Sequence, residues 1–242
     1  MSTIYSARFR CADCGAVLDV RIADSLNANR LPEARHWVLD RTLFQQPCAC
    51  GRNVTAIHPF LYADFERGLW LHVLPEDDRP AYPAHEPQVL AAYRAAFDPA
   101  IGPRFIEALG AMVVPRVVYG YEELREKVVC ADAALDDALV EALKFEILIG
   151  EPELLRRGVV LLTLEGADPQ ALRLRTHGFP PGEPGQILGE ITIARATYDE
   201  LAERRAAVRH SYPTLFDGVY VNVQRYRFEP VPEPEPTAYA TA

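Results

Sequence analysis

The stretch Cys11-Ala12-Asp13-Cys14-Gly15 has a similar counterpart later in the chain, Cys48-Ala49-Cys50-Gly51. Each segment holds two closely spaced cysteines followed by a glycine. Four thiolates in two such pairs meet the ligand requirement of a tetrahedral zinc site. A glycine after the second cysteine permits a tight turn, often with φ > 0, that points backbone N–H groups at sulfur. The two segments therefore predict one zinc ion bound by Cys11, Cys14, Cys48 and Cys50.

The two pairs differ in spacing, because one residue separates Cys48 from Cys50 whereas two separate Cys11 from Cys14. The shorter spacing leaves open a site of three cysteines with water or His58 as the fourth ligand. That open site would be the route to metal catalysis, since four protein ligands leave no position for water. A redox role is disfavoured because neither pair leads from a strand into a thioredoxin-like helix. Structural zinc is the leading interpretation.

Length and composition set the class of protein. A chain of 242 residues, 49% of them hydrophobic, suffices for one large or two small domains with a sizeable core. The net charge of −9 argues against a general nucleic-acid partner, because phosphate binding needs a concentrated basic surface. Met1 to Arg10 lacks a signal-peptide run, so we expect a cytoplasmic protein. In that reducing compartment paired cysteines favour metal over disulfides.

The expected fold class is α+β. A zinc-ribbon-like N-terminal module, with hairpins and one inserted helix, should precede a small α+β domain with a mainly antiparallel sheet. The expected divisions are a module at 1–80, a proline-rich linker and helix at 81–112, an α+β domain at 113–229, and a disordered acidic tail at 230–242.

Apolar patterning and turn residues place the elements of the first half. A strand from Ile4 to Arg10 should pair with one from Gly15 to Ile22, so that the hairpin tip holds the metal. Leu31-Pro32-Glu33 should begin a helix that ends near Leu43. A second hairpin is expected from Phe60 to Leu74, with Gly68 at its bend. Pro75 to Pro87 is predicted to be an exposed linker, followed by a helix from Glu86 to Phe97.

The second half should begin with a strand from Ala111 to Tyr119, in which Pro115 indicates a sheet edge or a bulge. Two helices follow, the second from Leu135 to Ile149 with Asp132 as its cap. Its acidic residues Asp136, Asp137 and Glu141 are expected to form a solvated face. The remaining expected elements are strands at Val159–Leu164, Leu172–Arg175, Ile187–Ile193 and Val219–Val223, and a helix opened by a capping box at Thr197–Glu200.

Three features together resemble a known family. They are the paired cysteines, the segment Phe60-Leu61-Tyr62-Ala63-Asp64, and the helix Tyr121-Glu122-Glu123-Leu124-Arg125-Glu126-Lys127. In these the chain is similar to the bacterial and archaeal CpXC domain proteins, through about residue 130. Two departures stand out: Ala12 takes the place of the family's proline, and Pro47 stands where the family's first cysteine of the second pair belongs. The resemblance implies a zinc site and no particular reaction.

Other catalytic signatures do not occur in the sequence. The histidines form no pair at metal-ligand spacing, no serine lies in a Gly-x-Ser-x-Gly elbow, and there is no phosphate-binding glycine loop. The favoured function is therefore a non-catalytic zinc-binding protein that acts as an interaction or assembly module with protein partners. The alternatives are a metal-dependent enzyme with an open three-cysteine zinc site, and a weak nucleic-acid binder that uses Arg8, Arg10, Arg21 and Arg52.

Overall fold

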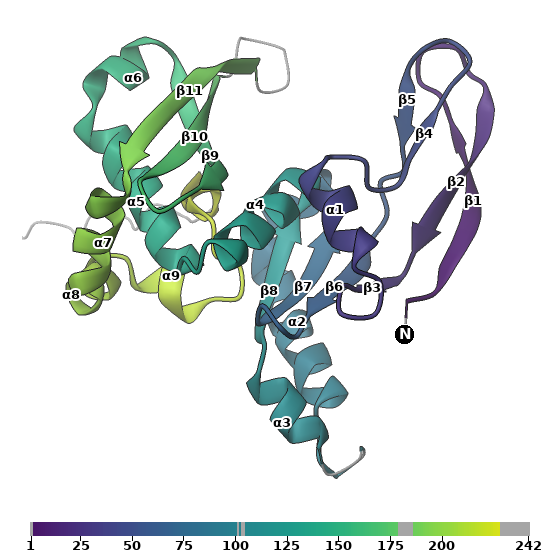
Figure 1. Ribbon diagram of the computed structural model, residues 1–242, viewed down its shortest axis with the longest axis horizontal. Coiled ribbons are helices and arrows are strands. Elements are labelled where there is room, and N and C mark those ends of the chain that lie inside the picture. Colours follow the sequence, from purple (N-terminus) through teal and green to yellow (C-terminus); the bar gives the residue numbers. More distant parts are fainter. Residues whose placement is uncertain (1, 101, 103–104, 179–185, 228–242) are drawn as a thin grey trace, which may run out of the picture.

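The computed structural model describes residues 2–100, 102, 105–178 and 186–227. Two hairpins project at one side, a four-stranded sheet lies in the middle, and a three-stranded sheet with its helices lies at the other side (Figure 1). Helices and strands are thus mixed, with the sheets small and separate, and the fold belongs to the α+β class as the sequence predicts. The predicted tail at 230–242 lies outside the described residues.

The projecting part consists of two antiparallel hairpins. Strand β1 (Ile4–Arg10) pairs with β2 (Val17–Ala23), and β4 (Gln45–Pro47) pairs with β5 (Asn53–Thr55). Alternate residues of β2, Val20 and Ile22, are buried, as expected for a strand with one face on a core. Helix α1 (Glu33–Leu39) lies between the hairpins in the chain. It ends before the predicted Leu43, because Asp40 closes it and Arg41 has φ 57°.

The middle sheet has the strand order β3-β6-β7-β8, from β3 (Ser25–Asn27), β6 (Phe60–Asp64), β7 (Leu69–Leu74) and β8 (Val114–Tyr119). β6 and β7 form the predicted hairpin, and β8 joins β7 in parallel. β8 is an edge strand of this sheet, so Pro115 removes no ladder bond that a second neighbour would need. The sheet thereby crosses the boundary predicted at residues 112 and 113.

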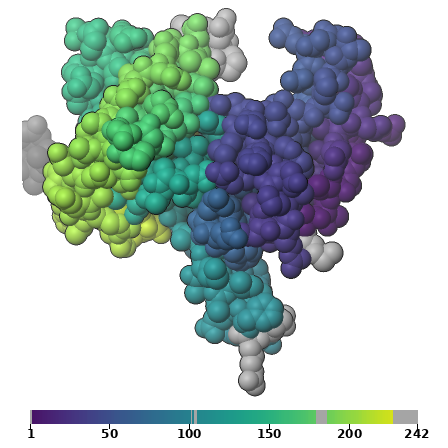
Figure 2. All heavy atoms as spheres, in the orientation of Figure 1, coloured from purple at the N-terminus to yellow at the C-terminus, as the bar shows by residue number. Residues whose placement is uncertain are grey.

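The segment predicted to be a linker is helical, which corrects the expectation for Pro75 to Pro87. A 3₁₀ helix, η1 (Glu76–Ala81), leads directly into α2 (Tyr82–Ala96), and α3 (Ile106–Ala111) follows. Pro83 lies in the first turn of α2, where a missing N–H costs little, whereas Pro80 and Pro87 lie inside η1 and α2. Figure 2 shows this part projecting from the body of the molecule.

The other side of the molecule is built around α5. This part of the chain comprises, in order, α4 (Gly120–Asp132), α5 (Asp137–Gly150), α6 (Pro152–Arg156), the antiparallel strands β9 (Val159–Ala167), β10 (Ala171–Gly178) and β11 (Gln186–Ala194), then α7 (Arg195–Glu203), α8 (Arg205–Ser211), α9 (Pro213–Asp217) and η2 (Val223–Arg227). Residues 138–144 of α5 are all buried, because helices and β9 pack around it. α5 is therefore a central core helix.

Both predicted helix starts in this half are wrong. Asp136, not Asp132, caps α5, and its carboxylate accepts the backbone N–H groups of Ala138 and Leu139. Asp132 instead forms ion pairs with Arg35 and Arg67. The capping box at Thr197–Glu200 does not form, since α7 already begins at Arg195 after Ala194. α5 thus keeps a local cap, four residues later than predicted, whereas α7 begins without a side-chain cap.

The segment Val219–Val223 is buried but is not a strand, which corrects the last predicted element. Val219 O accepts the backbone N–H of Val117 on β8 at 3.0 Å. The neighbouring backbone groups bond to charged side chains: Glu86 accepts the N–H of Val219 and of Tyr220. Because side chains satisfy its backbone, the segment needs no strand ladder. Within the described part of the chain, no helix has both the length and the apolar character needed to cross a membrane.

Candidate metal centre

Each cysteine pair lies in the loop of one hairpin. In the first, Cys11 N donates to Ala16 O at 2.8 Å and Gly15 N donates to Cys11 O at 2.9 Å. In the second, Cys48 N donates to Arg52 O at 2.7 Å and Gly51 N donates to Cys48 O at 2.9 Å. Gly15 and Gly51 both have positive φ, 74° and 87°, as their sequence positions predict. The second loop is one residue shorter, yet it closes with the same kind of bonds.

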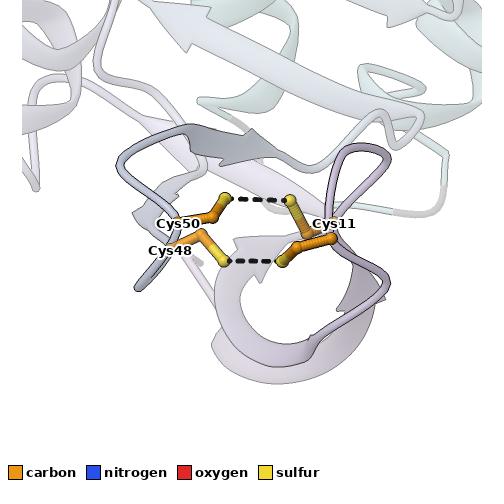
Figure 3. A group of neighbouring side chains, drawn as sticks. Cys11, Cys48 and Cys50 are labelled. Carbon is orange, nitrogen blue, oxygen red and sulfur yellow. Dashed lines mark hydrogen bonds between the residues drawn. The ribbon is translucent and has the colours of Figure 1, made fainter.

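The two loops bring the four sulfur atoms together (Figure 3). All four lie within 4.8 Å of one another. Cys11 Sγ is 3.7 Å from Cys50 Sγ, and Cys14 Sγ is 3.5 Å from Cys48 Sγ. A tetrahedral zinc with bonds of about 2.3 Å places its sulfurs about 3.8 Å apart. The cluster therefore has the size to hold a metal ion, and the short Cys48–Cys50 spacing is no obstacle.

Burial divides the cluster into two halves. Cys11 and Cys48 are buried against the apolar layer between the hairpins, whereas Cys14 and Cys50 are exposed. Backbone N–H groups of Cys14 and Asp13 lower the pKa of Cys11 to about 7. Although the N–H of Ala16 favours its thiolate, the neighbouring sulfurs raise the pKa of Cys14 to about 12. Four thiolates so close together need a cation to offset their mutual repulsion.

His58, the substitute ligand considered from the sequence, lies elsewhere. Its Nε2 atom is 3.1 Å from Asp24 Oδ1, and its ring packs edge-on against Tyr5. Asp24 Oδ1 also accepts the Tyr5 hydroxyl at 2.8 Å. His58 is thus held at the base of the β1–β2 hairpin, and the four cysteines by themselves make up the cluster.

A second group of ionisable side chains lies inside the molecule, where the sequence predicts a solvated face. We call it the charge ladder: Arg116 on β8, Glu126 and Lys127 on α4, and Asp137, Glu141 and Lys144 on α5. Glu141 and Lys144 are 1% and 0% exposed, which corrects that prediction. α5 has no solvent-facing side along these residues, so its charged groups must find partners within the protein.

The three cations and three carboxylates of the ladder form two groups, one centred on Asp137 and one centred on Lys144. Asp137 Oδ2 is 3.0 Å from both Arg116 Nε and Lys127 Nζ. Lys144 Nζ is 2.8 Å from Glu126 Oε1 and 2.6 Å from Glu141 Oε1. Burial favours the neutral acid at Asp137, but Lys127 and Arg116 outweigh it and lower its pKa. The two carboxylates beside Lys144 likewise raise its pKa against the effect of burial.

The ladder also binds backbone groups of distant segments. Glu126 accepts the N–H of Leu164 on β9 at 2.5 Å, and Glu141 accepts the N–H of Val223 at 3.0 Å. Lys127 Nζ donates to Val221 O at 2.6 Å. A cavity of about 410 Å³ adjoins the ladder. The ladder charges that line it, Arg116, Lys127 and Asp137, are paired with one another, so we interpret the ladder as structural.

The sequence of α5 does not reveal the ladder. Asp137, Glu141 and Lys144 follow one another at i, i+4 and i+7, so they share one helix face and resemble a solvated face. The i,i+3 spacing predicts only that Glu141 and Lys144 can meet. The partners on β8 and α4 carry no comparable signal, because only the fold brings them alongside α5.

A family model of the CpXC proteins matches residues 9–144, more than half of the chain. The chain belongs to the CpXC family. The match confirms the resemblance seen in the sequence and includes all four clustered cysteines. No curated protein and no solved structure matches the chain at a significant level. The CpXC region also holds every residue of the charge ladder, whereas the backbone groups bound at Leu164, Val221 and Val223 lie beyond it.

Proposed function

We propose that this CpXC protein is a non-catalytic zinc protein that serves as an interaction or assembly module. Cys11, Cys14, Cys48 and Cys50 would bind one Zn²⁺ and join the two hairpins. The observation that carries the proposal is the sulfur spacing of 3.5 and 3.7 Å across the two loops, against about 3.8 Å in a tetrahedral four-thiolate zinc site. Such a site has a structural role, since four protein ligands leave no position for water.

The proposed role in protein binding rests on shape and charge. The hairpins that carry the cysteines project from the body (Figure 1), and the net charge of −9 favours protein partners over nucleic acid. Zinc would fix these short hairpins, because two-stranded hairpins are marginal alone in water. Reduced thiols are required throughout, which fits the cytoplasmic location expected from the sequence.

Cobalt substitution tests the proposed site. We expect one Co²⁺ per chain, with the intense absorption of a four-thiolate tetrahedral complex that does not change with pH near neutrality. Cys130→Ala is the matched control, because Cys130 is buried on α4, away from the cluster, and its loss should leave the spectrum unchanged. A weaker three-sulfur spectrum that shifts with pH would favour the open, catalytic site instead. Metal content well below one per chain would refute the zinc site.

A further inference from the structure

The cavity of about 410 Å³ beside the charge ladder lies where the middle sheet meets the helices of the other side of the molecule. Its walls come from the turn between β6 and β7, from β7 and β8, from α4 and the start of α5, and from α8 and α9. These elements, distant in sequence, meet to the left of β8 in Figure 1. A volume of this size accommodates a small molecule, and ligand sites commonly lie at such junctions.

Positive charge dominates the lining of this cavity. The charged side chains that line it are the cations Arg67, Arg116, Lys127 and Arg205 and the carboxylates Asp136 and Asp137. The lining thus has an excess of two positive charges, although the whole chain carries −9. The exposed fraction of these cationic side chains falls from 51% at Arg205 to 3% at Lys127, so the positive charge extends from the rim to the floor.

Both carboxylates of the lining already have partners. Asp137 pairs with Arg116 and Lys127. Asp136 caps the first turn of α5 and pairs with Arg205. A cation that entered the cavity would therefore have to displace an existing partner from either carboxylate. At the floor, Arg116 and Lys127 stay within the ladder and contribute positive potential to the cavity.

The two arginines at the rim retain hydrogen-bond donors. Arg67 uses Nε for Asp132 and Nη1 for Asp64, neither of which lines the cavity. Arg205 uses Nε and Nη2 for Asp136. Among the hydrogen bonds of the described residues, none involves Nη2 of Arg67 or Nη1 of Arg205. A guanidinium held from one side in this way keeps its remaining N–H groups for a ligand.

We propose that this cavity binds a small organic anion whose carboxylate or phosphate group is held by Arg67 and Arg205. Arginine suits either group because its planar fork can donate two parallel hydrogen bonds. Apolar residues of the lining, among them Leu69, Leu135 and Phe216, would contact the body of the ligand. The Arg205 guanidinium lies 5.1 Å from the centre of the Phe216 ring, which helps to fix its position. The proposal goes beyond the zinc module and does not depend on it.

Calorimetric titration of the full chain tests the ligand class. The probes are phenyl phosphate and benzoate, which distinguish the two acidic groups, and the neutral benzyl alcohol. We expect saturable binding of at least one anion at one site per chain, and no binding of benzyl alcohol. Arg205→Gln should weaken anion binding about tenfold, because a charge-assisted hydrogen bond is lost. Arg209→Gln is the matched control, since Arg209 is similarly exposed on the same helix but does not line the cavity.

A second variant tests the cavity itself without changing any charge. Ala131 lies on α4 and lines the cavity, so Ala131→Leu should fill part of the volume and also weaken binding about tenfold. In the unmodified chain, phenyl phosphate or benzoate should shift the amide NMR signals of Gly68 and Ala131, on opposite walls. Melting temperatures equal to that of the unmodified chain establish that binding, not folding, has changed. If one variant is unstable, the other decides.

The remaining outcomes would overturn the proposal. Absence of saturable binding for both anions rejects the site. Binding that neither Arg205→Gln nor Ala131→Leu weakens must use another surface. Equal weakening by Arg205→Gln and Arg209→Gln would show attraction to the general surface of α8, and benzyl alcohol binding as tightly as the anions would show that positive charge has no part in recognition.

Discussion

The cysteine cluster and the charge ladder solve the same electrostatic problem in different ways. Both gather ionisable groups at distances where like charges repel strongly. The ladder offsets its own charge, since its three cations and three carboxylates are paired at 2.6 to 3.0 Å in two groups, one around Asp137 and one around Lys144. The cysteine cluster holds four sulfurs and no cationic side chain among its possible ligands, so a bound ion is the counter-charge that we propose for its thiolates.

The cysteine cluster and the charge ladder differ in how their counter-charges can be removed. A chelator can withdraw the proposed zinc and leave the covalent chain unchanged, whereas the ladder loses a partner only by mutation or protonation. The stability of the hairpins that carry the cysteines should therefore depend on bound metal, and the stability of the core around α4 and α5 should depend on side-chain charge.

Removing a thiolate should have the largest effect, confined to the projecting hairpins. Cys11→Ala leaves three sulfurs for the ion, and structural zinc contributes about 10 kcal/mol to folding in small zinc peptides. We expect loss of bound zinc and of amide-exchange protection in β1, β2, β4 and β5, with protection of α5 retained. Metal analysis with hydrogen exchange measures both. Cys130→Ala should retain its zinc, and loss of α5 protection in Cys11→Ala would show that the two regions are not separable.

Removing one charge from the ladder should destabilise the opposite side of the molecule. Lys144→Met leaves Glu126 and Glu141 buried without their cation, which costs about 3 to 5 kcal/mol. Urea unfolding should show this decrease while the zinc content stays at one per chain.

A compensated variant is the matched control for that experiment. Lys144→Met combined with Glu126→Gln and Glu141→Gln removes the buried charge as a set, so most of the lost stability should return. A Lys144→Met protein as stable as the original would mean that the ladder contributes little to folding.

Between about pH 4.5 and 7, a rise in pH should lower the stability of the core around α4 and α5 and should strengthen zinc binding at the cysteine cluster. Burial raises the pKa of Glu123, next to the ladder on α4, to about 7 although Arg79 opposes the shift. In that range the folded protein binds more protons than the unfolded chain, so the free energy of unfolding falls as pH rises. Zinc binding strengthens over the same range, because fewer protons compete for the thiolates.

The Glu123→Gln variant separates these two effects. In the unmodified chain, Glu123 should make the free energy of unfolding fall by about 2 to 3 kcal/mol between pH 4.5 and 7. Denaturant unfolding of Glu123→Gln at several pH values should show that this fall is absent. The pH dependence of zinc content should stay unchanged, since Glu123 is not among the clustered thiols. An unchanged slope would assign the pH dependence to another buried acid, such as Glu141, whose pKa is also raised.

The smallest effect is expected at the surface beside the cysteines. Arg52 Nε is 3.8 Å from Asp13 Oδ2, and both side chains are largely exposed. Exposed pairs of this kind contribute about 0 to 1 kcal/mol. Arg52→Ala should therefore leave both zinc affinity and the melting temperature nearly unchanged. A clear loss of zinc in this variant would show that the second loop depends on Arg52 for more than its backbone.

The sequence by itself determined the parts of this protein that depend on neighbouring residues. Cys11 and Cys14, or Cys48 and Cys50, lie in single tight loops whose glycines have the predicted positive φ. Short-range patterning likewise placed β6 and β7 in a hairpin around Gly68 and kept β8, with Pro115, at a sheet edge. The clustering of the four thiols followed, because two loops that each present a pair need only one contact between hairpins.

Only the tertiary structure decided the charge ladder and the elements around it. Asp137, Glu141 and Lys144 look solvent-exposed from their own helix, and their burial depends on what packs against α5 from β9 and the last described helices. Val219–Val223 has the alternation of a strand, yet its backbone bonds to Glu86, Lys127 and Glu141 from three distant helices. Local periodicity encodes which face of an element is apolar. It does not encode which distant charge will be close enough to make burial of a polar group favourable.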